Sequence, residues 1–384
     1  MVRVLVVGPR NGLCNALVAL GIPFVVWSER GRRRPGAEHL YVAPVEVSRD
    51  VARREAEKLA EYGPFSHVIA GTETAVLTAA VVRRVVGARR YAHTTVIRCR
   101  DKLHMKNHLR GHGIPMTAFL DGRNPPSPST ITRELGLPAV VKPRLKSGAR
   151  GLKFVNNQSE MTPSRLRGQI LEKFVDAPEV SVESFIGSGE VLFQNITEYA
   201  QKARINVVPG SVTGTTHEAV LDLNRRVLQA LDIKWGMTHL EVYLTREGPL
   251  FGEIALRPPG GYIMDLLRLA WGFDPWIAYV ATELARPFAF PSRPLAHAAA
   301  IILHPGEGTV SEIRGLEQVR AMESVVSAAI RIRPGARIEA RTSVGRDGGH
   351  VLMRTRSRSD LRRTLSEVDA TLRFSMTPEP GQRI

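Results

Sequence analysis

Short apolar runs alternate with helical patterns through the first part of the chain. The runs cover residues 2–7, 23–27 and 67–71, and helical spacing marks the segments at 51–62 and 73–86. Strands that alternate with helices in this way are typical of a parallel sheet with crossover connections. The pattern therefore predicts an α/β unit at the N-terminus.

Glu73 stands just after the third apolar run, at the start of a predicted helix. In open parallel sheets, ligands contact the loops that follow the strand ends. A glutamate in the first turn of a helix also stabilises the helix dipole without any ligand. The pattern leaves both interpretations of Glu73 open.

Strict alternation of polar and apolar residues marks two runs further along, at 240–244 and 250–256. If the hairpin between them closes about Glu247, Glu241 and Glu253 lie directly opposite each other on one face. Like charges that face each other across strands are destabilising, so we expect positive charge between them. Two carboxylates on rigid strands suit Mg²⁺, which takes one or two protein carboxylates. A surface hairpin with solvated glutamates is the alternative.

Residues 137–143 form a predicted strand with Lys142 near its end. A basic, glycine-containing turn at 144–151 leads directly into a second strand at 152–155. This strand–loop–strand differs from the strand–loop–helix of a P-loop, and the GxxxxGK[ST] signature is absent. Glycine turns with cations cover phosphates through backbone N–H groups and side-chain charge. Without further context, however, the segment is simply a basic turn.

Composition limits the class of protein. A length of 384 residues with 43% hydrophobic content predicts a globular protein of two or three domains. Cys14 and Cys99 make neither a disulfide framework nor a zinc cluster. No apolar run has the length of a membrane span or the pattern of a signal peptide. We therefore expect a cytoplasmic enzyme that does not interact with a membrane.

The formal net charge of +16 comes from 53 lysine and arginine residues against 37 acidic ones. These basic residues are spread along the chain, and neither a nucleic-acid motif nor interleaved aromatic residues accompany them. We expect no nucleic-acid partner. An arginine-rich coding bias or a surface that attracts anionic substrates accounts better for the charge.

The succession of these segments resembles the ATP-grasp superfamily, and the resemblance covers essentially the whole chain. The matching segments are the DK…GIP entry at 101–115, the LPAVVKP strand at 137–143, the basic glycine turn at 146–151, the EKFV segment at 172–175 and the hairpin at 236–261. Each motif is loose, but their joint order and spacing are specific.

The resemblance implies a role for each matching residue. It implies that Arg257 and Glu253 are catalytic and that Glu241 and Glu253 bind metal. The residues that it implies for ATP binding are Lys102, Lys142, Lys146, Ser147, Gly148, Arg150, Glu172, Lys173, Phe174, Val175 and Glu179. The candidate substrate contacts are Glu73, His217, His239, Gly260 and Gly261. For the two histidines, packing or hydrogen bonding is the default interpretation and general-base catalysis the alternative.

One position departs from the usual family pattern. Many members have Glu-x-Asn-x-Arg, with the asparagine as a further magnesium ligand, whereas residues 253–257 carry Ala255 at that place. The number of metal sites is therefore left open. Alternation places Arg257 on the same face as Glu253, where it could hold a phosphate oxygen. Some L-amino-acid ligases of the superfamily also have alanine there, and residues 307–325 resemble that branch.

The resemblance implies an α/β fold with some α+β character. We expect a Rossmann-like N-terminal domain at 1–98, a nucleotide-binding core at 99–292 with a lid at roughly 132–172, and a C-terminal α+β subdomain at 293–384.

The resemblance also implies an activity. The expected protein is an ATP-dependent carboxylate–amine ligase that forms an amide through an acyl phosphate, releases ADP and phosphate, and uses an amino acid. The expected cofactors are ATP and Mg²⁺, or Mn²⁺ in its place, and the expected assembly is a homodimer acting on small-molecule carboxylates and amines. The alternatives are an ATP-grasp carboxylase, a purine-pathway-like ligase and a non-catalytic nucleotide-binding protein.

Overall fold

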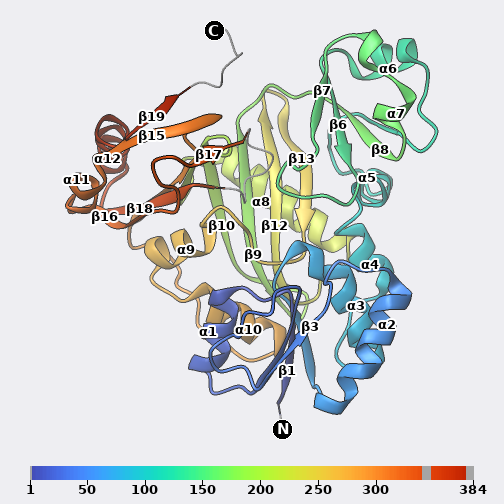
Figure 1. Cartoon of the computed structure of the whole chain (residues 1–384). Helices are drawn as coiled ribbons and strands as arrows, with labels where there is room; N and C mark the ends of the chain where they lie inside the picture. The colour runs from blue at the N-terminus through green and yellow to red at the C-terminus, as the bar shows by residue number, and fades with distance from the viewer. Residues whose placement is uncertain (1, 340–346, 378–384) are drawn as a thin grey trace.

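The computed structural model describes residues 2–339 and 347–377. These residues form four β-sheets with helices packed against them (Figure 1). The predicted α/β class is confirmed, since a parallel sheet opens the chain and antiparallel sheets follow it.

The N-terminal sheet is parallel, in the order β3-β2-β1-β4. Its strands are β1 (Val4–Val7), β2 (Phe24–Ser28), β3 (His39–Val42) and β4 (His67–Ala70). Both β1 and β2 are buried throughout, so they read as continuous apolar runs rather than as alternating ones. The helical segments of this part are α1 (Asn11–Ala19), α2 (Arg49–Lys58), η1 (Leu59–Tyr62), η2 (Glu73–Ala75), α3 (Val76–Val85) and α4 (His93–Arg98).

An eight-stranded sheet forms the centre of the molecule, in the order β13-β12-β9-β10-β11-β14-β18-β16. Every pairing in it is antiparallel. Its strands are β9 (Glu179–Gly187), β10 (Glu190–Gln201), β11 (Ile205–Val208), β12 (Gly236–Thr245), β13 (Gly248–Ala255), β14 (His297–Leu303), β16 (Val325–Ile330) and β18 (Gly349–Thr355). The sheet therefore combines strands from both the predicted core and the predicted C-terminal subdomain.

The two faces of the central sheet carry different residues. Helix α8 (Gly214–Ala230) packs on one face, where Val182 and Leu240 join its apolar side chains. On the opposite face, α9 (Ile263–Trp271) and α10 (Pro275–Glu283) cover the end of the sheet that holds Phe185 and Met237. The same core cluster includes apolar residues of β1, β2 and α1, so the N-terminal unit shares a core with the central sheet.

A smaller antiparallel sheet, in the order β5-β8-β6-β7, stands beside the central one at the upper right of Figure 1. Its elements are β5 (Phe119–Asp121), α6 (Pro128–Leu135), β6 (Ala139–Pro143), β7 (Lys153–Val155), η3 (Gln158–Glu160), α7 (Pro163–Leu166) and β8 (Gln169–Lys173), preceded by α5 (Lys102–Gly111). The predicted strand–loop–strand is confirmed, because β6 and β7 pair antiparallel across the basic turn.

The C-terminal part adds a three-stranded sheet in the order β17-β15-β19. Its elements are β15 (Gly308–Arg314), α11 (Leu316–Arg320), β17 (Arg337–Ile338), α12 (Arg358–Thr371) and β19 (Arg373–Thr377). Among the described residues, no helix has both the length and the apolar character needed to cross a bilayer.

Candidate active site

The two glutamates of the central hairpin face each other. Glu241 and Glu253 are paired in the register of β12 and β13, as predicted. The reason differs from the expected symmetric closure, because the turn closes at Thr245 and Gly248 and Gly252 forms a bulge. A regular ladder from that turn would place Gly252 opposite Glu241 and direct Glu253 to the other face. The bulge therefore sets the geometry of the carboxylate pair.

Positive side chains flank this pair. Lys102 Nζ lies 2.9 Å from Glu253 Oε1, and His239 Nε2 lies 3.8 Å from Glu241 Oε1. Burial raises the pKa of Glu253, Lys102 opposes this effect and Glu241 adds to it. Burial also acts to raise the pKa of Glu241, but His239 and Lys142 lower it to about 2. Two facing carboxylates with opposed pKa shifts form a site that a bound cation would stabilise.

The carboxylate pair fits a magnesium ion by its chemistry. The Glu241 and Glu253 side chains are 36% and 25% exposed, which leaves their oxygens accessible to a ligand. Within the described ranges, no group of three or more histidine, cysteine, aspartate or glutamate residues is arranged to hold a metal. Mg²⁺ accepts one or two protein carboxylates and takes water and phosphate oxygens for the rest. Ala255 supplies no oxygen beyond its backbone, so Glu241 and Glu253 are the candidate donors.

His239 is held by a fully buried carboxylate. Its Nδ1 lies 2.9 Å from Glu183 Oε1, and Glu183 also accepts hydrogen bonds from Ser181, Asn195 and Thr197. Burial acts to lower the pKa of His239, but Glu183 and Glu241 raise it to about 9. A protonated imidazole cannot accept a proton, so this geometry favours the hydrogen-bonding interpretation of His239 over general-base catalysis.

Two lysines share another buried carboxylate, Glu172. Lys142 Nζ lies 2.9 Å from Glu172 Oε2, and Lys106 Nζ lies 3.3 Å from Glu172 Oε1. Lys106 also donates to Thr117 Oγ1 at 2.7 Å. Burial acts to raise the pKa of Glu172, but the two lysines lower it to about 2. One carboxylate therefore faces two ammonium groups, which leaves positive charge for an anion.

The basic glycine turn lies against the start of α5. Lys102 Nζ donates to the Lys146 carbonyl oxygen at 2.5 Å and thereby joins the turn to Glu253. Within the turn, Arg150 Nε donates to the Ser147 carbonyl oxygen at 3.1 Å. Gly148 has φ 64°, a left-handed conformation that glycine adopts at little cost. The turn is exposed and cationic, as a flap over phosphates requires.

An aromatic pair lies where β8 ends. Phe174, which follows β8, and Phe154 on β7 meet edge to face, with ring centroids 5.7 Å apart. Both side chains are unusually exposed for phenylalanine, at 37% and 47%. The flanking residues Lys173 and Val175 are exposed and partly exposed, and the Lys173 N–H is already bonded to Ala118 O. Two solvent-accessible rings of this kind suit a flat heterocycle.

Glu179 begins β9 and lies opposite Tyr243 in the register. Its carboxylate is buried and lies 2.5 Å from Lys202 Nζ. Burial raises its pKa, and Glu241 adds to that effect. The charge of Glu241, a candidate metal ligand, therefore acts on the Glu179 carboxylate.

Arg257 lies beyond the end of β13, which stops at Ala255, so the strand-face interpretation does not extend to it. Its Nε instead lies 2.6 Å from Glu73 Oε2 on the N-terminal unit. Arg100 Nε lies 3.4 Å from the other oxygen of Glu73, whose residue is only 9% exposed. The structure therefore brings Glu73 to the predicted catalytic arginine, and its role as a substrate contact stays a prediction.

The remaining predicted contacts are more peripheral. Gly261 has φ 59°, and its carbonyl oxygen accepts a hydrogen bond of 2.8 Å from Asn206 Nδ2. Gly260 is exposed beside it. His217 lies in the first turns of α8, and no side-chain contact joins it to the cluster in the described part of the chain. The role of His217 as a substrate contact stays a prediction.

Several functional candidates were not predicted from the sequence. Lys106 lies four residues after Lys102 on α5, a spacing that puts both on one helix face. Glu183 follows Glu179 at an even spacing, so both share one face of β9. These two signals were readable in the sequence. The partnership of Phe154 with Phe174 was not, because it depends on how two separate strands come together.

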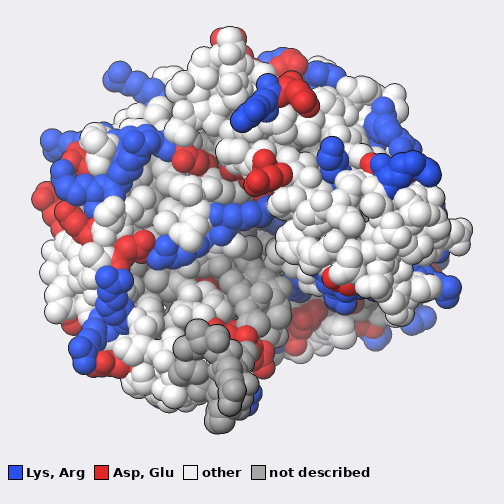
Figure 2. Space-filling view, turned by 90° about the horizontal axis from the view of Figure 1, so that it is seen from above, with Lys and Arg blue, Asp and Glu red and all other residues white. Residues whose placement is uncertain are grey.

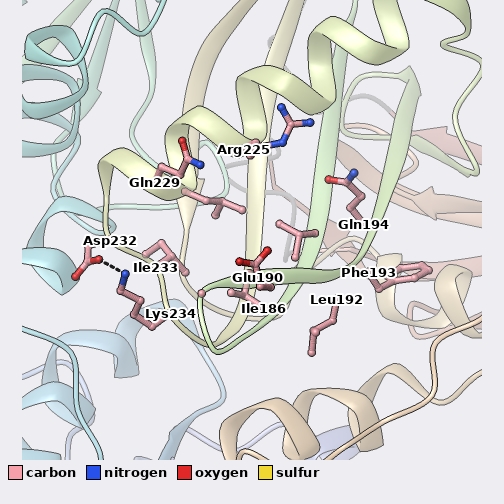
Figure 3. Close-up of a pocket in the computed structure, with 13 residues that line it drawn as sticks. Ile186, Glu190, Leu192, Phe193, Gln194, Arg225, Gln229, Asp232, Ile233 and Lys234 are labelled. Atoms are coloured by element: carbon pink, nitrogen blue, oxygen red, sulfur yellow. Dashed lines mark ion pairs between the residues drawn. The ribbon is translucent and has the colours of Figure 1, made fainter.

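A cavity of about 490 Å³ opens at the other end of the central sheet (Figure 3). It lies beside the β9–β10 turn and the C-terminal end of α8, and Asp232 and Lys234 form a 2.7 Å ion pair at its edge. Glu179 begins β9, whereas the cavity residue Ile186 lies near the other end of that strand. This cavity is separate from the polar cluster.

Basic and acidic side chains are interspersed over the face seen in Figure 2, with no single-sign surface covering it. This distribution suits a local field around a cleft better than a continuous nucleic-acid track.

Comparisons with known proteins agree with this geometry. A family model for the ATP-grasp domain matches residues 107–264, and a model for the L-amino acid ligase C-terminal domain 2 matches residues 300–377. An L-arginine-specific L-amino acid ligase of Bacillus subtilis is 24% identical over 363 residues, which cover 89% of this chain and 88% of that protein.

Solved structures share the fold along the whole chain. The crystal structure of an L-amino acid ligase from Bacillus licheniformis superposes with a TM-score of 0.84 at 20% identity, covering 98% of this chain and 99% of that one. The N5-carboxyaminoimidazole ribonucleotide synthetase from Thermotoga maritima gives a TM-score of 0.76 at 20% identity, with 98% and 100% covered.

The chain therefore belongs to the ATP-grasp superfamily. Within it, the C-terminal domain match and the similarity to an L-amino acid ligase over most of both chains assign it to the carboxylate–amine ligases, and the protein is an ATP-dependent carbon–nitrogen ligase.

Proposed function

We propose that this ligase uses ATP to activate the carboxylate of an amino acid and joins it to the amine of a second amino acid. The observation that carries the proposal is the opposed Glu241–Glu253 pair, which lies beside Lys102 and the basic glycine turn. In this proposal the two carboxylates would hold a metal beside the cationic turn, as transfer of the ATP γ-phosphate requires.

The nucleotide has a matching set of contacts in this proposal. Lys142 is partly exposed and shares Glu172 with the buried Lys106, so Lys142 would hold phosphate oxygens, and the turn with Lys146, Ser147, Gly148 and Arg150 would close over them. Phe154 and Phe174 would flank the adenine, beside the backbone of residues 172–175. Glu179 would accept hydrogen bonds from the ribose hydroxyls.

Mg²⁺ is the metal that the site fits best, with Mn²⁺ as a substitute. Glu241 and Glu253 would hold it, and when bound it would neutralise charge on the transferring phosphate. With Ala255 in place of a third oxygen donor, the protein supplies two carboxylates and phosphates would complete the coordination.

The chemistry follows from what these residues do. The substrate carboxylate oxygen forms a bond to the γ-phosphorus as the bond to the β–γ bridging oxygen breaks, which gives an acyl phosphate and ADP. The second substrate's amine then attacks the acyl carbon, phosphate leaves, and the amine loses a proton to become the amide. Arg257 would stabilise the oxyanion of this second step, and the closed turn would exclude water that hydrolyses the acyl phosphate.

ADP release with ATP and Mg²⁺ tests the proposal, measured against the twenty L-amino acids singly and in pairs. We expect release that depends on a particular pair, together with a product whose mass equals the two amino acids minus water. Release with bicarbonate and no amino acid pair would instead favour the carboxylase alternative. ATP binding without release under any of these conditions would contradict the ligase proposal.

Three further expectations belong to the same proposal. The division into domains at 1–98, 99–292 and 293–384 stays a prediction, as do the homodimer and the cytoplasmic location. Light scattering coupled to size-exclusion chromatography tests the dimer, since a particle of the mass of one chain would contradict it.

A further inference from the structure

The strand order of the N-terminal sheet reverses at β1. In the order β3-β2-β1-β4, the chain moves outward from β1 to β3 and then crosses to the other side of β1 to form β4. Ligands of open α/β sheets bind outside the carboxyl ends of the strands at such a point. Here those ends carry Arg10, just after β1, and Glu73, just after β4.

The two loops at this point are in direct contact. A Cβ atom added to Gly71 would lie 2.3 Å from the Gly8 carbonyl oxygen, so glycine is required for the loops to approach. The segment that follows β13 closes over both. Arg257 pairs with Glu73, while Arg10 NH1 donates to the carbonyl oxygens of Pro258 and Pro259 at 3.2 and 2.6 Å.

This arrangement leaves an excess of positive charge. Arg257 NH1 also donates to the Pro258 carbonyl oxygen, at 2.8 Å, so two guanidinium groups converge on one oxygen. Glu73 is already shared by Arg257 and Arg100. No carboxylate in the described ranges forms an ion pair with Arg10, whose guanidinium lies 4.6 Å from the centre of the Trp276 ring.

The electrostatics of Arg10 favour the binding of an anion. Burial, followed by the charge of Arg257, lowers the pKa of Arg10 to about 10. Asp265 on α9 acts in the opposite direction but only as a weaker influence without contact. A partly buried cation next to a second cation is stabilised when an anion binds between or beside them.

We propose that Arg10 binds the α-carboxylate of the amino acid that supplies the attacking amine, and so determines that the acceptor carries a free carboxylate. This inference rests on the proposed ligase function. Lys102 joins the basic turn to Glu253 of the hairpin, whereas Arg10 immediately precedes α1, which lies beside α10 (Figure 1). An α-amino group is two bonds from its carboxylate carbon, so a carboxylate held at Arg10 keeps the amine near Arg257. A guanidinium binds a carboxylate through two parallel hydrogen bonds, which a carboxamide cannot match.

The test compares acceptors with and without the carboxylate. In the wild-type protein with ATP and Mg²⁺, each amino acid that serves as an acceptor is measured against its carboxamide. Arg10→Met should raise the KM for the free amino acid at least tenfold while changing the KM for the carboxamide and for ATP less than twofold. Arg10→Lys should recover part of the loss, because it restores the charge without the planar fork.

Arg30→Met is the matched control, since Arg30 follows the neighbouring strand β2, is exposed, and its loss changes the net charge equally. It should leave both KM values unchanged. Equal losses for the two kinds of acceptor in Arg10→Met would overturn the proposal, as would an unchanged KM for the free amino acid.

Tryptophan fluorescence gives a readout that does not depend on turnover, because Arg10 lies over Trp276. Free amino acids should change the emission of the wild-type protein, and their carboxamides should not. If the protein turns over but Arg10→Met does not selectively raise the KM for the free amino acid, this subsite is rejected and the ligase function is retained. A wild-type protein that shows neither turnover nor a fluorescence response to any amino acid rejects both.

Discussion

Single buried carboxylates organise the charges of this site. Glu172 holds two lysines, Glu183 holds His239 and Glu73 holds two arginines. A buried charge is tolerated when partners and hydrogen bonds surround it, and its removal leaves those partners unpaired. Each of these residues therefore fixes the position of the groups that would meet substrate.

The first prediction concerns Glu172. Its pKa is lowered to about 2 from the ordinary glutamate value of 4.5, so Glu172 stabilises the folded state above about pH 4.5 and loses that contribution as the pH falls toward 2. We expect Glu172→Gln to be less stable than wild type by about 3 kcal/mol at neutral pH. Urea unfolding at pH 7, 5, 4 and 3 should show this difference shrinking through the acid window.

Glu190→Gln serves as the control, because Glu190 is exposed at the start of β10. It should change stability by less than about 0.5 kcal/mol at every pH. A difference between wild type and Glu172→Gln that stays constant from pH 5 to pH 3 would contradict the assigned charge state.

The second prediction concerns Glu253. Replacing it with glutamine removes a charged oxygen ligand with little change in volume, so phosphoryl transfer should fall at least a hundredfold while the fold persists. The measurements are ADP release under the wild-type substrate conditions and Mg²⁺ affinity in the presence of ADP. Glu247→Gln, on the exposed turn of the same hairpin, should behave as wild type. Full activity of Glu253→Gln would disprove the metal assignment.

At the scale of elements, the bulge at Gly252 decides where the site forms. An added Cβ at Gly252 would lie 3.0 Å from the Glu241 carbonyl oxygen and 3.2 Å from Tyr243 Cε2. The two strands therefore come too close there for a larger residue without local movement. The small residue and the extra backbone unit together direct Glu253 toward Glu241.

Gly252→Val tests this role. The branched side chain should separate β12 and β13 locally, cost about 1–3 kcal/mol of stability and weaken Mg²⁺ binding about tenfold or more. Unfolding by urea and Mg²⁺ titration in the presence of ADP measure the two effects. Gly111→Ala is a matched control at a helical glycine with open space around its Cβ position, and it should be neutral or slightly stabilising. Unchanged Mg²⁺ affinity in Gly252→Val would show that the bulge does not set the metal site.

The sequence predicted strands well where a continuous apolar run or strict alternation marks the segment. The apolar runs became β1, β2 and β4, and the alternating runs became β12 and β13. It did not predict β10, whose twelve residues form the longest strand among those described, because its exposed and buried positions do not alternate regularly. Gly272, with φ 77°, ends α9 and separates it from α10.

The sequence could not predict which distant residues contact each other, for a physical reason. Patterns report which face a residue occupies, but Arg257 meets Glu73 only because a loop and a distant strand end come together in space. The carboxylate pair was predicted from alternation, whereas the bulge that makes it possible leaves no periodic signal.

At the scale of the molecule, the N-terminal unit and the central sheet share one core. The largest cluster joins β1, β2 and α1 to α9, α10 and the central strands. A buried ion pair strengthens this junction, since Arg83 NH2 on α3 lies 3.2 Å from Glu283 Oε2 on α10. Their side chains are only 7% and 10% exposed. Arg10, just after β1, therefore lies on a unit that shares a packed core with the central sheet.

Breaking that ion pair tests the shared core. Arg83→Met leaves Glu283 as an unpaired buried carboxylate, and we expect a loss of about 3–5 kcal/mol, because burial already raises the pKa of Glu283. Arg83→Met combined with Glu283→Leu should recover much of it, since no charge then remains buried. Arg53→Met, at the exposed ion pair with Glu57, should cost less than about 1 kcal/mol. Urea unfolding followed by circular dichroism and by tryptophan fluorescence should give coincident transitions in every variant. Separate transitions for the two probes would mean that the N-terminal unit unfolds independently, and the shared core would then not couple the two parts.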